Sequence, residues 1–271
     1  MVGSVDFASW RDIDMTAARP WNWEDPQELA ATVDLFTEDL ARVDKVSLAL
    51  TAPLLTREHL DQLGVTGIEF AAFKSAHPQA LGTDLVSLTD ATGARTGPGH
   101  VYRVDDSAYF AEMDIAQSLP VADDTVDWVF AEHLIEHVSL RVGIAWLTEV
   151  RRILRPGGLL RLTTPDLKVY AQSYVNGDGF FAKHRRRMNR ALTGVAPAMP
   201  ARGAFMFNQL FYVYGHRWLY DLEELRHALT TAGFDESGIT VRAYREGARQ
   251  DVADLDQVLR NDESIYVEAT A

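Results

Sequence analysis

Short apolar runs alternate with amphipathic segments through the middle of the chain, and this alternation constrains the fold more than any other feature. Four runs look like strands: GIEFAAF at 67–73, ALGTDLVSL at 80–88, DWVFAE at 127–132 and LLRLTTPD at 159–166. Between the last two, VGIAWLTEVRRI has its apolar residues on one helical face and precedes the helix-stopping Pro156-Gly157-Gly158. Strands that alternate with helices predict an α/β fold with a parallel sheet and helices on both faces.

The flanking parts of the chain follow other patterns. Apolar residues recur at helical spacing from Pro26 to Val43, and a second helix is predicted at Thr56–Leu63. The amphipathic stretch at 220–234 predicts a late helix, and ITVRAYRE and SIYVEAT predict two closing strands. Residues 168–218 interrupt the alternation with a basic run and an aromatic-rich stretch, which indicates an insertion into the domain.

The composition excludes several classes of protein. The formal net charge of −13 and the pI near 5.0 argue against broad nucleic-acid binding, which needs a basic surface. The chain has no cysteine, so disulfides and thiolate metal sites are excluded. No apolar run approaches the ~20 residues that span a bilayer, and the N-terminus has no basic-then-apolar signal pattern. We therefore expect a cytoplasmic protein with no membrane partner.

Two linked stretches, DIAQSLPVADDTVDWVFAEHLIEHV and LTEVRRILRPGGLLRLTTPD, carry a family resemblance. A strand ends before Asp114, and a polar loop leads to the next strand. That strand runs into Glu-His, and the helix after it closes on Leu-Arg-Pro-Gly-Gly. Over roughly residues 66–166 this pattern resembles class I S-adenosylmethionine (SAM)-dependent methyltransferases of the type 11-like group. The resemblance implies a Rossmann-like α/β fold, with a mostly parallel seven-stranded sheet flanked by helices and SAM at the carboxyl ends of the strands.

With this resemblance the chain divides into four parts of a single domain. They are an N-terminal helical lead (1–64), a cofactor-binding core (65–167), an inserted lid (168–218) and a C-terminal helix with closing strands (219–271). The resemblance implies an acid for the ribose hydroxyls after the second strand, an acid for the adenine after the third, and methionine contacts after the fourth. The implied cofactor-binding residues are Glu69, Ala71, Phe73, Asp84, Asp114, Ile115, Glu132 and His133.

The loop after the first core strand departs from the family pattern. The family has acid-x-Gly-x-Gly there, whereas Glu69-Phe70-Ala71-Ala72-Phe73 keeps the acid and lacks both glycines. If Phe73 takes a positive φ, the backbone strain is on the order of 1–3 kcal/mol. Two interpretations stay open. The loop is rearranged and still binds SAM, or the pocket is degenerate and the protein is a methyltransferase-like binding or regulatory protein that does not methylate. The retained acids at the other positions favour the first.

The segment His133-Leu134-Ile135-Glu136-His137 matches the His-x-x-Glu-His string of inverted zinc peptidases, but it lies at a strand-to-helix junction. It also resembles the Glu-x-x-Glu-His of metal-dependent O-methyltransferases that act in the ubiquinone pathway or on small-RNA 2′-hydroxyls. In the RNA enzymes a later histidine joins the metal, and His216 falls at that place. The implied ligands of Mg, Mn or Zn are His133, Glu136, His137 and His216, and three histidines suit zinc, manganese or iron better than magnesium. In the alternative without metal, Glu136 caps the next helix and His137 only packs.

The predicted catalytic set is His133, His137, His216 and Asp166. A bound metal lowers the pKa of an acceptor hydroxyl, and without a metal His133 or His216 is the candidate general base. Asp166 orients a substrate hydroxyl or caps the next helix. We expect SAM-dependent O-methylation of a small-molecule or saccharide acceptor, with a homodimer as one option and an RNA end as the third-ranked function. The basic run at 183–190 is interpreted first as a solvated helix face and second as a grip on an anionic acceptor.

Overall fold

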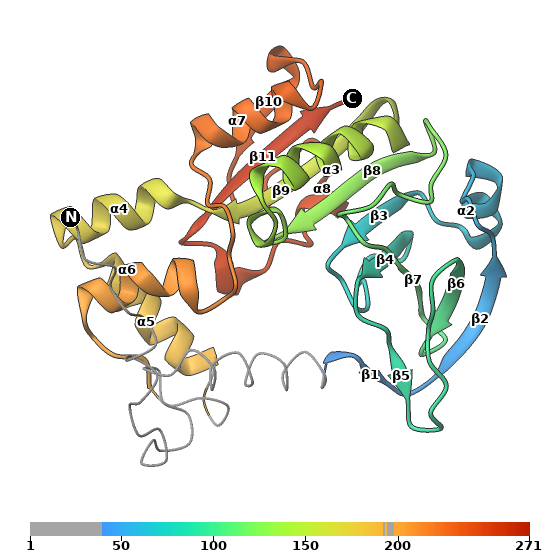
Figure 1. Ribbon diagram of the computed structural model, residues 1–271, viewed down its shortest axis with the longest axis horizontal. Helices are drawn as coiled ribbons and strands as arrows, with labels where there is room; N and C mark the ends of the chain where they lie inside the picture. Colours follow the sequence, from blue (N-terminus) through green and yellow to red (C-terminus); the bar gives the residue numbers. More distant parts are fainter. Residues whose placement is uncertain (1–39, 192, 194–197) are drawn as a thin grey trace, which may run out of the picture.

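The computed structural model describes residues 40–191, 193 and 198–271, and its centre is one large sheet (Figure 1). The strands of this sheet are β2 (Val46–Thr51), β3 (Gly67–Phe70), β4 (Ala80–Asp84), β6 (His100–Val104), β7 (Ala108–Glu112), β8 (Val126–Glu132), β9 (Leu154–Pro165), β10 (Ile239–Arg242) and β11 (Ser264–Thr270). A separate parallel pair consists of β1 (Arg42–Val43) and β5 (Thr89–Asp90).

Helices precede, link and follow these strands. The α-helices are α2 (Arg57–Leu63), α3 (Leu140–Ile153), α4 (Leu167–Asn176), α5 (Phe180–Ala191), α6 (Gly203–Tyr212), α7 (Leu222–Thr231) and α8 (Gln250–Ala253). Within the described residues, the short 3-10 helices are η3 (Ile135–His137), η4 (Glu236–Gly238) and η5 (Val258–Arg260). Within the described residues, no helix has both the length and the apolar character needed to cross a membrane.

The strand order places a ligand-binding edge in the middle of the sheet. The order is β10-β11-β9-β8-β3-β4-β7-β6-β2. The five neighbours from β9 to β7 are parallel, and β11 runs antiparallel between β9 and β10. These seven strands form the mostly parallel sheet that the sequence predicts, and the antiparallel strands β6 and β2 extend it to nine. The order reverses between β3 and β8, and open parallel sheets bind their ligands at such a reversal.

The predicted core elements lie close to their expected positions. Thr56 caps α2, and its hydroxyl accepts a hydrogen bond from the His59 N–H. Helix α3 ends at Ile153, before the predicted stop at Pro156, because a residue that precedes proline is sterically disfavoured in the helical region. The helix predicted at Pro26–Val43 lies mostly outside the described residues, and its last two residues form β1.

The connection between β3 and β4 contains no helix, although parallel neighbours usually need a crossover of a dozen or more residues. Residues 71–79 form a loop whose first part lies against β4, where the Ala72 N–H donates to the Thr83 carbonyl oxygen at 3.0 Å. A Cβ at Gly82 would lie 2.9 Å from the Ala72 carbonyl oxygen, so the close approach of this loop requires glycine. The predicted helix layer is therefore missing from this link.

The two faces of the sheet are covered differently. Helices α2, α3 and α7 pack on one face, into the main apolar core that includes Val129. On the opposite face the connection between β10 and β11, residues 243–263, brings Val252 of α8 against Trp128 and Phe130 of β8. Within the described residues, a helix layer thus covers one face and this late connection with its short helix covers the other (Figure 1).

Arg161, in the middle of β9, fixes the 243–263 connection to the sheet and is fully buried. Its guanidinium contacts both carboxylate oxygens of Asp256, at 2.5 and 2.8 Å, and one of Glu268 at 3.1 Å. It also donates to the carbonyl oxygens of Glu246 and Ala243, at 3.0 and 3.3 Å. These contacts match the five N–H donors of arginine, so the buried cation is fully satisfied.

A buried polar network joins helices α4, α5 and α6, which lie in the segment that the sequence predicts to be inserted, to the core. Tyr170 of α4 donates to Glu263, which precedes β11. Arg187 of α5 pairs with Asp262 and Glu263, and the His184 ring lies 2.8 Å from the Arg187 guanidinium. Part of the basic run is therefore buried and ion-paired, which differs from the solvated helix face that is our first interpretation of the sequence.

Replacing Arg161 by methionine is expected to lower the free energy of unfolding by about 3–5 kcal/mol, because Asp256 and Glu268 then stay buried without a counter-charge. Urea unfolding measures the change. In the control variant Arg226→Met, which removes an exposed ion pair with Glu236, the loss is expected to stay within about 1 kcal/mol. Equal losses in the two variants would contradict the anchoring role of Arg161.

Candidate functional site at the carboxyl ends of the strands

Ala71 and Phe73 stand in the turn after β3 at the two positions where the family pattern has glycine, and only one of them has a left-handed backbone. Ala71 has φ of 55°, in the left-handed region, whereas Phe73 has no positive φ. The concern that Phe73 is strained is therefore wrong, and the strain lies at Ala71. The Phe73 side chain packs beside Leu88 and Phe110, in a small apolar cluster on the β7 side of the sheet. The phenylalanine thus anchors the loop through this cluster.

Two carboxylates at the reversal point share one face of the sheet. Glu69 of β3 and Glu132 of β8 each have one buried oxygen, Oε2, without a hydrogen-bond partner. Burial raises the pKa of Glu69, and it raises that of Glu132 to about 7. The other oxygen of Glu132 accepts from the Gln257 N–H at 3.0 Å. Unsatisfied buried acceptors at a ligand-binding edge mark places where a donor from a ligand is stabilising.

The other predicted cofactor residues follow the next two strands. Asp84, at the end of β4, is half-buried, and its carboxylate accepts from the Val86 N–H at 3.0 Å. Asp114 lies two residues after β7, and its carboxylate accepts from the Ala116 N–H at 2.8 Å. Ile115 packs against the main core. Both acids thus end adjacent strands at the same edge, where the resemblance places the ribose and the adenine.

His133 leaves the end of β8 in a strained conformation. Its φ is 52°, and non-glycine residues in this region cluster at functional sites. Its Nε2 lies 2.7 Å from the Ser264 hydroxyl, and its Nδ1 lies 3.4 Å from Glu136 Oε1. No long helix contains His133, Glu136 and His137, because the chain makes the short turn η3 there, and Ser139 rather than Glu136 caps α3. The peptidase geometry is therefore absent.

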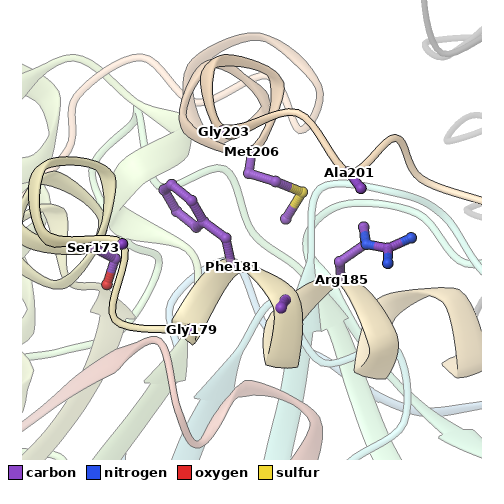
Figure 2. Close-up of a pocket in the computed structure, with 9 residues that line it drawn as sticks. Ser173, Gly179, Phe181, Arg185, Ala201, Gly203 and Met206 are labelled. Carbon is purple, nitrogen blue, oxygen red and sulfur yellow. The ribbon is translucent and has the colours of Figure 1, made fainter.

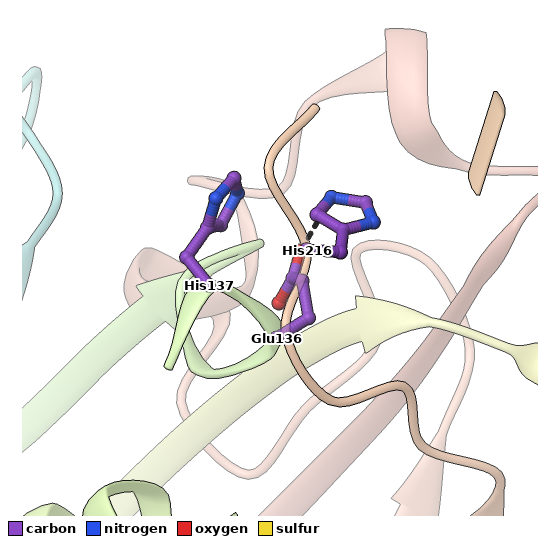
Figure 3. Close-up of side chains that lie close together, drawn as sticks. All are labelled: Glu136, His137 and His216. Atoms are coloured by element: carbon purple, nitrogen blue, oxygen red, sulfur yellow. Dashed lines mark ion pairs between the residues drawn. The ribbon is translucent and has the colours of Figure 1, made fainter. Parts of the chain in front are cut away.

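Glu136, His137 and His216 form a cluster at the same edge (Figure 3). One ligand-type atom from each lies within 4.8 Å of the others, and the two imidazole rings meet edge to face. The Arg217 and Trp218 N–H groups donate to the Glu136 carbonyl oxygen, which holds His216 beside η3. His133, the fourth predicted metal ligand, contacts Glu136 but is not a member of this cluster.

The hydrogen bonds within the cluster leave two unsatisfied acceptors. Glu136 is fully buried, its Oε2 accepts from the Thr164 hydroxyl at 3.0 Å, and its Oε1 has no hydrogen-bond partner. His216 Nδ1 lies 2.6 Å from the Leu210 carbonyl oxygen, so Nδ1 carries the proton and Nε2 keeps its lone pair, 3.9 Å from Glu136 Oε1. Burial raises the pKa of Glu136 to about 7 and lowers that of His216 to about 3. Both groups are therefore available in an uncharged form near neutral pH.

Asp166 is the N-cap of α4, one of the two roles that the sequence predicts for it. Its carboxylate accepts from the Lys168 N–H at 2.9 Å and caps α4. Burial raises the pKa of Asp166. The capping interpretation therefore agrees with the geometry, and the catalytic assignment of Asp166 stays a prediction.

Arg260 is a site residue that sequence reasoning missed. It ends η5 and lies half-buried beside the cluster, where its Nη1 donates to the Glu132 carbonyl oxygen at 3.3 Å. Its charge opposes the burial that raises the pKa values of Glu132 and Glu136. No sequence pattern identifies Arg260, because its place depends on the fold of the 243–263 connection.

The inserted helices carry a cavity of about 250 Å³ away from this cluster (Figure 2). Phe181 of α5 and Met206 of α6 point into it, and Arg185 lies at one end. The remaining lining residues are small: Ser173, Gly177, Gly179, Ala182, Ala201 and Gly203. The cavity lies at the far end of α4 from Asp166, so it is not the site of the Glu136 cluster.

The sequence matches the family model of a methyltransferase domain over residues 31–236. The chain therefore belongs to this family, and its strand order is that of the Rossmann-like SAM-dependent methyltransferases. A search of curated proteins finds no match.

Several solved structures resemble the chain. They include the CurJ carbon methyltransferase (TM-score 0.39, 13% identity, 77% of this chain and 48% of that chain), a SAM-dependent methyltransferase from Archaeoglobus fulgidus (0.41, 10%, 79% and 92%) and one from Mesorhizobium loti (0.40, 17%, 80% and 98%). The chain thus spans about half of the first protein and most of the other two.

The left-handed turn at Ala71 makes a prediction about stability. Ala71→Gly relieves a steric cost of about 1–2 kcal/mol and adds about 0.5–1 kcal/mol of unfolded-state entropy, so a net gain between zero and about 1.5 kcal/mol is expected. The neighbouring variant Ala72→Gly has no positive φ to relieve and is expected to lose about 0.5–1 kcal/mol. Thermal and urea unfolding of the pair test this. Destabilisation of both variants by the same amount would argue against strain at Ala71.

The buried carboxyl of Glu136 makes a prediction about pH. Its folded-state pKa is raised, so its contribution to stability is full below the unfolded pKa, near 4.5, and is lost as pH rises through about 7. Glu136→Gln is expected to gain stability over the wild type between pH 5 and 8, by roughly 3 kcal/mol at most. The control is Glu149→Gln, because the Arg152 hydrogen bond lowers the pKa of Glu149 to about 2, below this window. Urea unfolding in a chelator measures both, and a constant difference for Glu136→Gln would refute the raised pKa.

Proposed function

We propose that this SAM-dependent methyltransferase transfers the methyl group to a hydroxyl oxygen of a small-molecule or saccharide acceptor. The observation that carries the proposal is the unpartnered, buried Oε1 of Glu136 beside the free Nε2 of His216, at the edge where the sheet order reverses. An acceptor hydroxyl placed there meets groups that can take up its proton. A hydroxyl is a weak nucleophile until it loses its proton, so a nearby proton acceptor assists an oxygen acceptor directly.

Cofactor binding in this proposal uses the acids at the strand ends. Asp84 and Asp114 receive the ribose and the adenine, while Glu69 and Glu132 face the methionine end, where their free oxygens accept from its ammonium group. The turn at Ala71 presents its backbone to the cofactor without glycine. This arrangement favours the rearranged loop over the degenerate pocket.

The transfer itself is an in-line displacement. The acceptor oxygen attacks the methyl carbon, the carbon–sulfur bond breaks, and the electron pair stays on sulfur to give S-adenosylhomocysteine. The hydroxyl proton passes to His216 Nε2, and the ionised form of Glu136, which is populated near its pKa of about 7, stabilises the positive charge that develops on the imidazole. Most of the rate then comes from the alignment of the acceptor, which the inserted helices and β8 provide.

A divalent metal is the finer part of the proposal, and the donor set fits one. Glu136 Oε1, His137 and His216 would hold it, with His216 oriented by the Leu210 carbonyl as metal-bound histidines commonly are. Burial keeps His216 neutral at pH 7, which suits it as a ligand. When bound, the metal would lower the pKa of the acceptor hydroxyl. Two imidazoles and one carboxylate favour zinc or manganese over magnesium.

Titration calorimetry with S-adenosylhomocysteine, with and without a chelator, tests the cofactor site. Micromolar or tighter binding to the folded protein is expected, and the control Asp84→Asn should bind at least about tenfold more weakly because a charged acceptor for the ribose is lost. A folded protein that does not bind would support the non-methylating alternative. Within this proposal a chelator-sensitive affinity would place a metal near the pocket.

Replacing His216 by alanine tests the proton acceptor. Transfer of radiolabelled methyl groups from SAM to a mixture of hydroxylated acceptors is expected to fall about a hundredfold or more, while the affinity for S-adenosylhomocysteine stays within about twofold. The matched control is His227→Ala, on the surface helix α7, which should keep full activity. Unchanged transfer by His216→Ala would exclude this role.

A further inference from the structure

Arg260 is a half-buried cation with spare hydrogen-bond donors at the functional edge. Among the described residues, its guanidinium donates one hydrogen bond, to the Glu132 carbonyl oxygen, and forms no ion pair. The charge of Arg260 acts to lower the pKa values of three acids with which it forms no ion pair: Glu132, Glu136 and Glu263. A guanidinium offers five donors, so most of those on Arg260 remain for a ligand.

The other arginines around the 243–263 connection are occupied, which sets Arg260 apart. Arg161 donates hydrogen bonds to Asp256 and Glu268, and Arg242 forms an ion pair with Glu268 at 2.7 Å. Arg187 pairs with Asp262 and Glu263. Arginine matches carboxylates and phosphates through two parallel hydrogen bonds, and a desolvated guanidinium gains most from such a partner.

The position of Arg260 in the fold identifies the side from which that partner comes. The cofactor acids follow β7, β4, β3 and β8, in that spatial order, and Arg260 lies beyond β8, in the turn that enters β11. Its guanidinium contacts the Glu132 carbonyl oxygen at the end of β8, one residue before His133, and its charge lowers the pKa values of His133 and His137. In the proposed function the acceptor hydroxyl lies at the Glu136 and His216 pair, so Arg260 is on the acceptor side of the site.

We propose that Arg260 binds an anionic group of the acceptor, so that the substrate is an acidic saccharide or hydroxy acid carrying a carboxylate or a phosphate. The inference rests on the proposed function, and it narrows the acceptor class. The oxyanion pairs with the free donors of Arg260, and its hydroxyl then lies toward Glu136 and His216. An acidic acceptor also explains why a chain with a net charge of −13 keeps an unpaired guanidinium at this edge.

Matched ligands test the proposal on the wild-type protein saturated with S-adenosylhomocysteine. The probes are D-glucuronate for a carboxylate, D-glucose 6-phosphate for a phosphate, and D-glucose as the neutral partner, each titrated by ligand-observed NMR. At least one acid is expected to bind about ten- to a hundredfold more tightly than glucose, as a charge-assisted hydrogen-bond pair provides. Whichever acid gains identifies the oxyanion, and no preference for either acid overturns the proposal.

Three variants locate the preference. Arg260→Met should bring the acid to within about twofold of glucose, and Arg260→Lys should keep part of the preference because a point charge remains. Arg226→Met, which removes the same charge on α7, should change nothing. Melting temperatures are measured for all three, because a merely structural Arg260 would change stability and leave the preference intact, and that result overturns the proposal.

Two rival sites for the anion have separate outcomes. If the preference disappears in Arg185→Met and persists in Arg260→Met, the anion binds in the cavity of the inserted helices instead (Figure 2). If Arg260→Met weakens S-adenosylhomocysteine but not 5′-methylthioadenosine, which lacks the methionine carboxylate, Arg260 holds the cofactor. Either result overturns the proposal. If the wild-type protein does not bind S-adenosylhomocysteine, the proposed function itself is contradicted, and this result is distinguishable from a failure of the Arg260 proposal alone.

Discussion

The buried ion pair between Arg161 and Asp256 holds the face of the sheet from which a crossover helix is missing. The loop of residues 71–79 is too short to carry a helix between β3 and β4, so Trp128 and Phe130 need another cover. The 243–263 connection provides it, and Arg161 fastens this connection from within. Because a lone buried charge is costly, the anchor holds only while all its partners are in place.

The same connection also builds half of the functional edge. It ends with Arg260 and Glu263, and β11 then begins with Ser264, whose hydroxyl contacts His133. Glu263 in turn binds Tyr170 and so joins the inserted helices to the core. One segment therefore covers the sheet, positions the strained histidine and connects the insertion. The chemistry at the edge depends on burial in each case, since burial raises the pKa of Glu136 and lowers that of His216.

The sequence was sufficient for the parts of the fold that local patterns determine. Apolar alternation placed β3, β4, β8 and β9, and the Thr56 cap placed α2. The grouping of Glu136, His137 and His216 followed only from the resemblance to metal-dependent O-methyltransferases, and no local pattern in the sequence predicts it. The sequence placed His133 at the strand-to-helix junction but did not indicate the left-handed backbone that it adopts directly after β8. Arg260 could not be found at all, since its site is made by contacts distant in sequence. The sequence pattern also does not indicate that Phe73 packs against Leu88 and Phe110.

The late position of the 243–263 connection has a consequence for how the protein folds. The hydrogen bonds that attach this connection and the start of β11 to the sheet and the functional edge join residues far apart in the chain: 95 residues for Arg161 with Asp256, 125 for Glu132 with Gln257 and 131 for His133 with Ser264. Such distant contacts form slowly, because a long loop must close before any of them contributes. During synthesis, the core strands are complete long before their second cover emerges from the ribosome. The nascent chain therefore exposes Trp128 and Phe130 until residues 243–263 are synthesised, and exposed apolar surface of this kind is prone to aggregation.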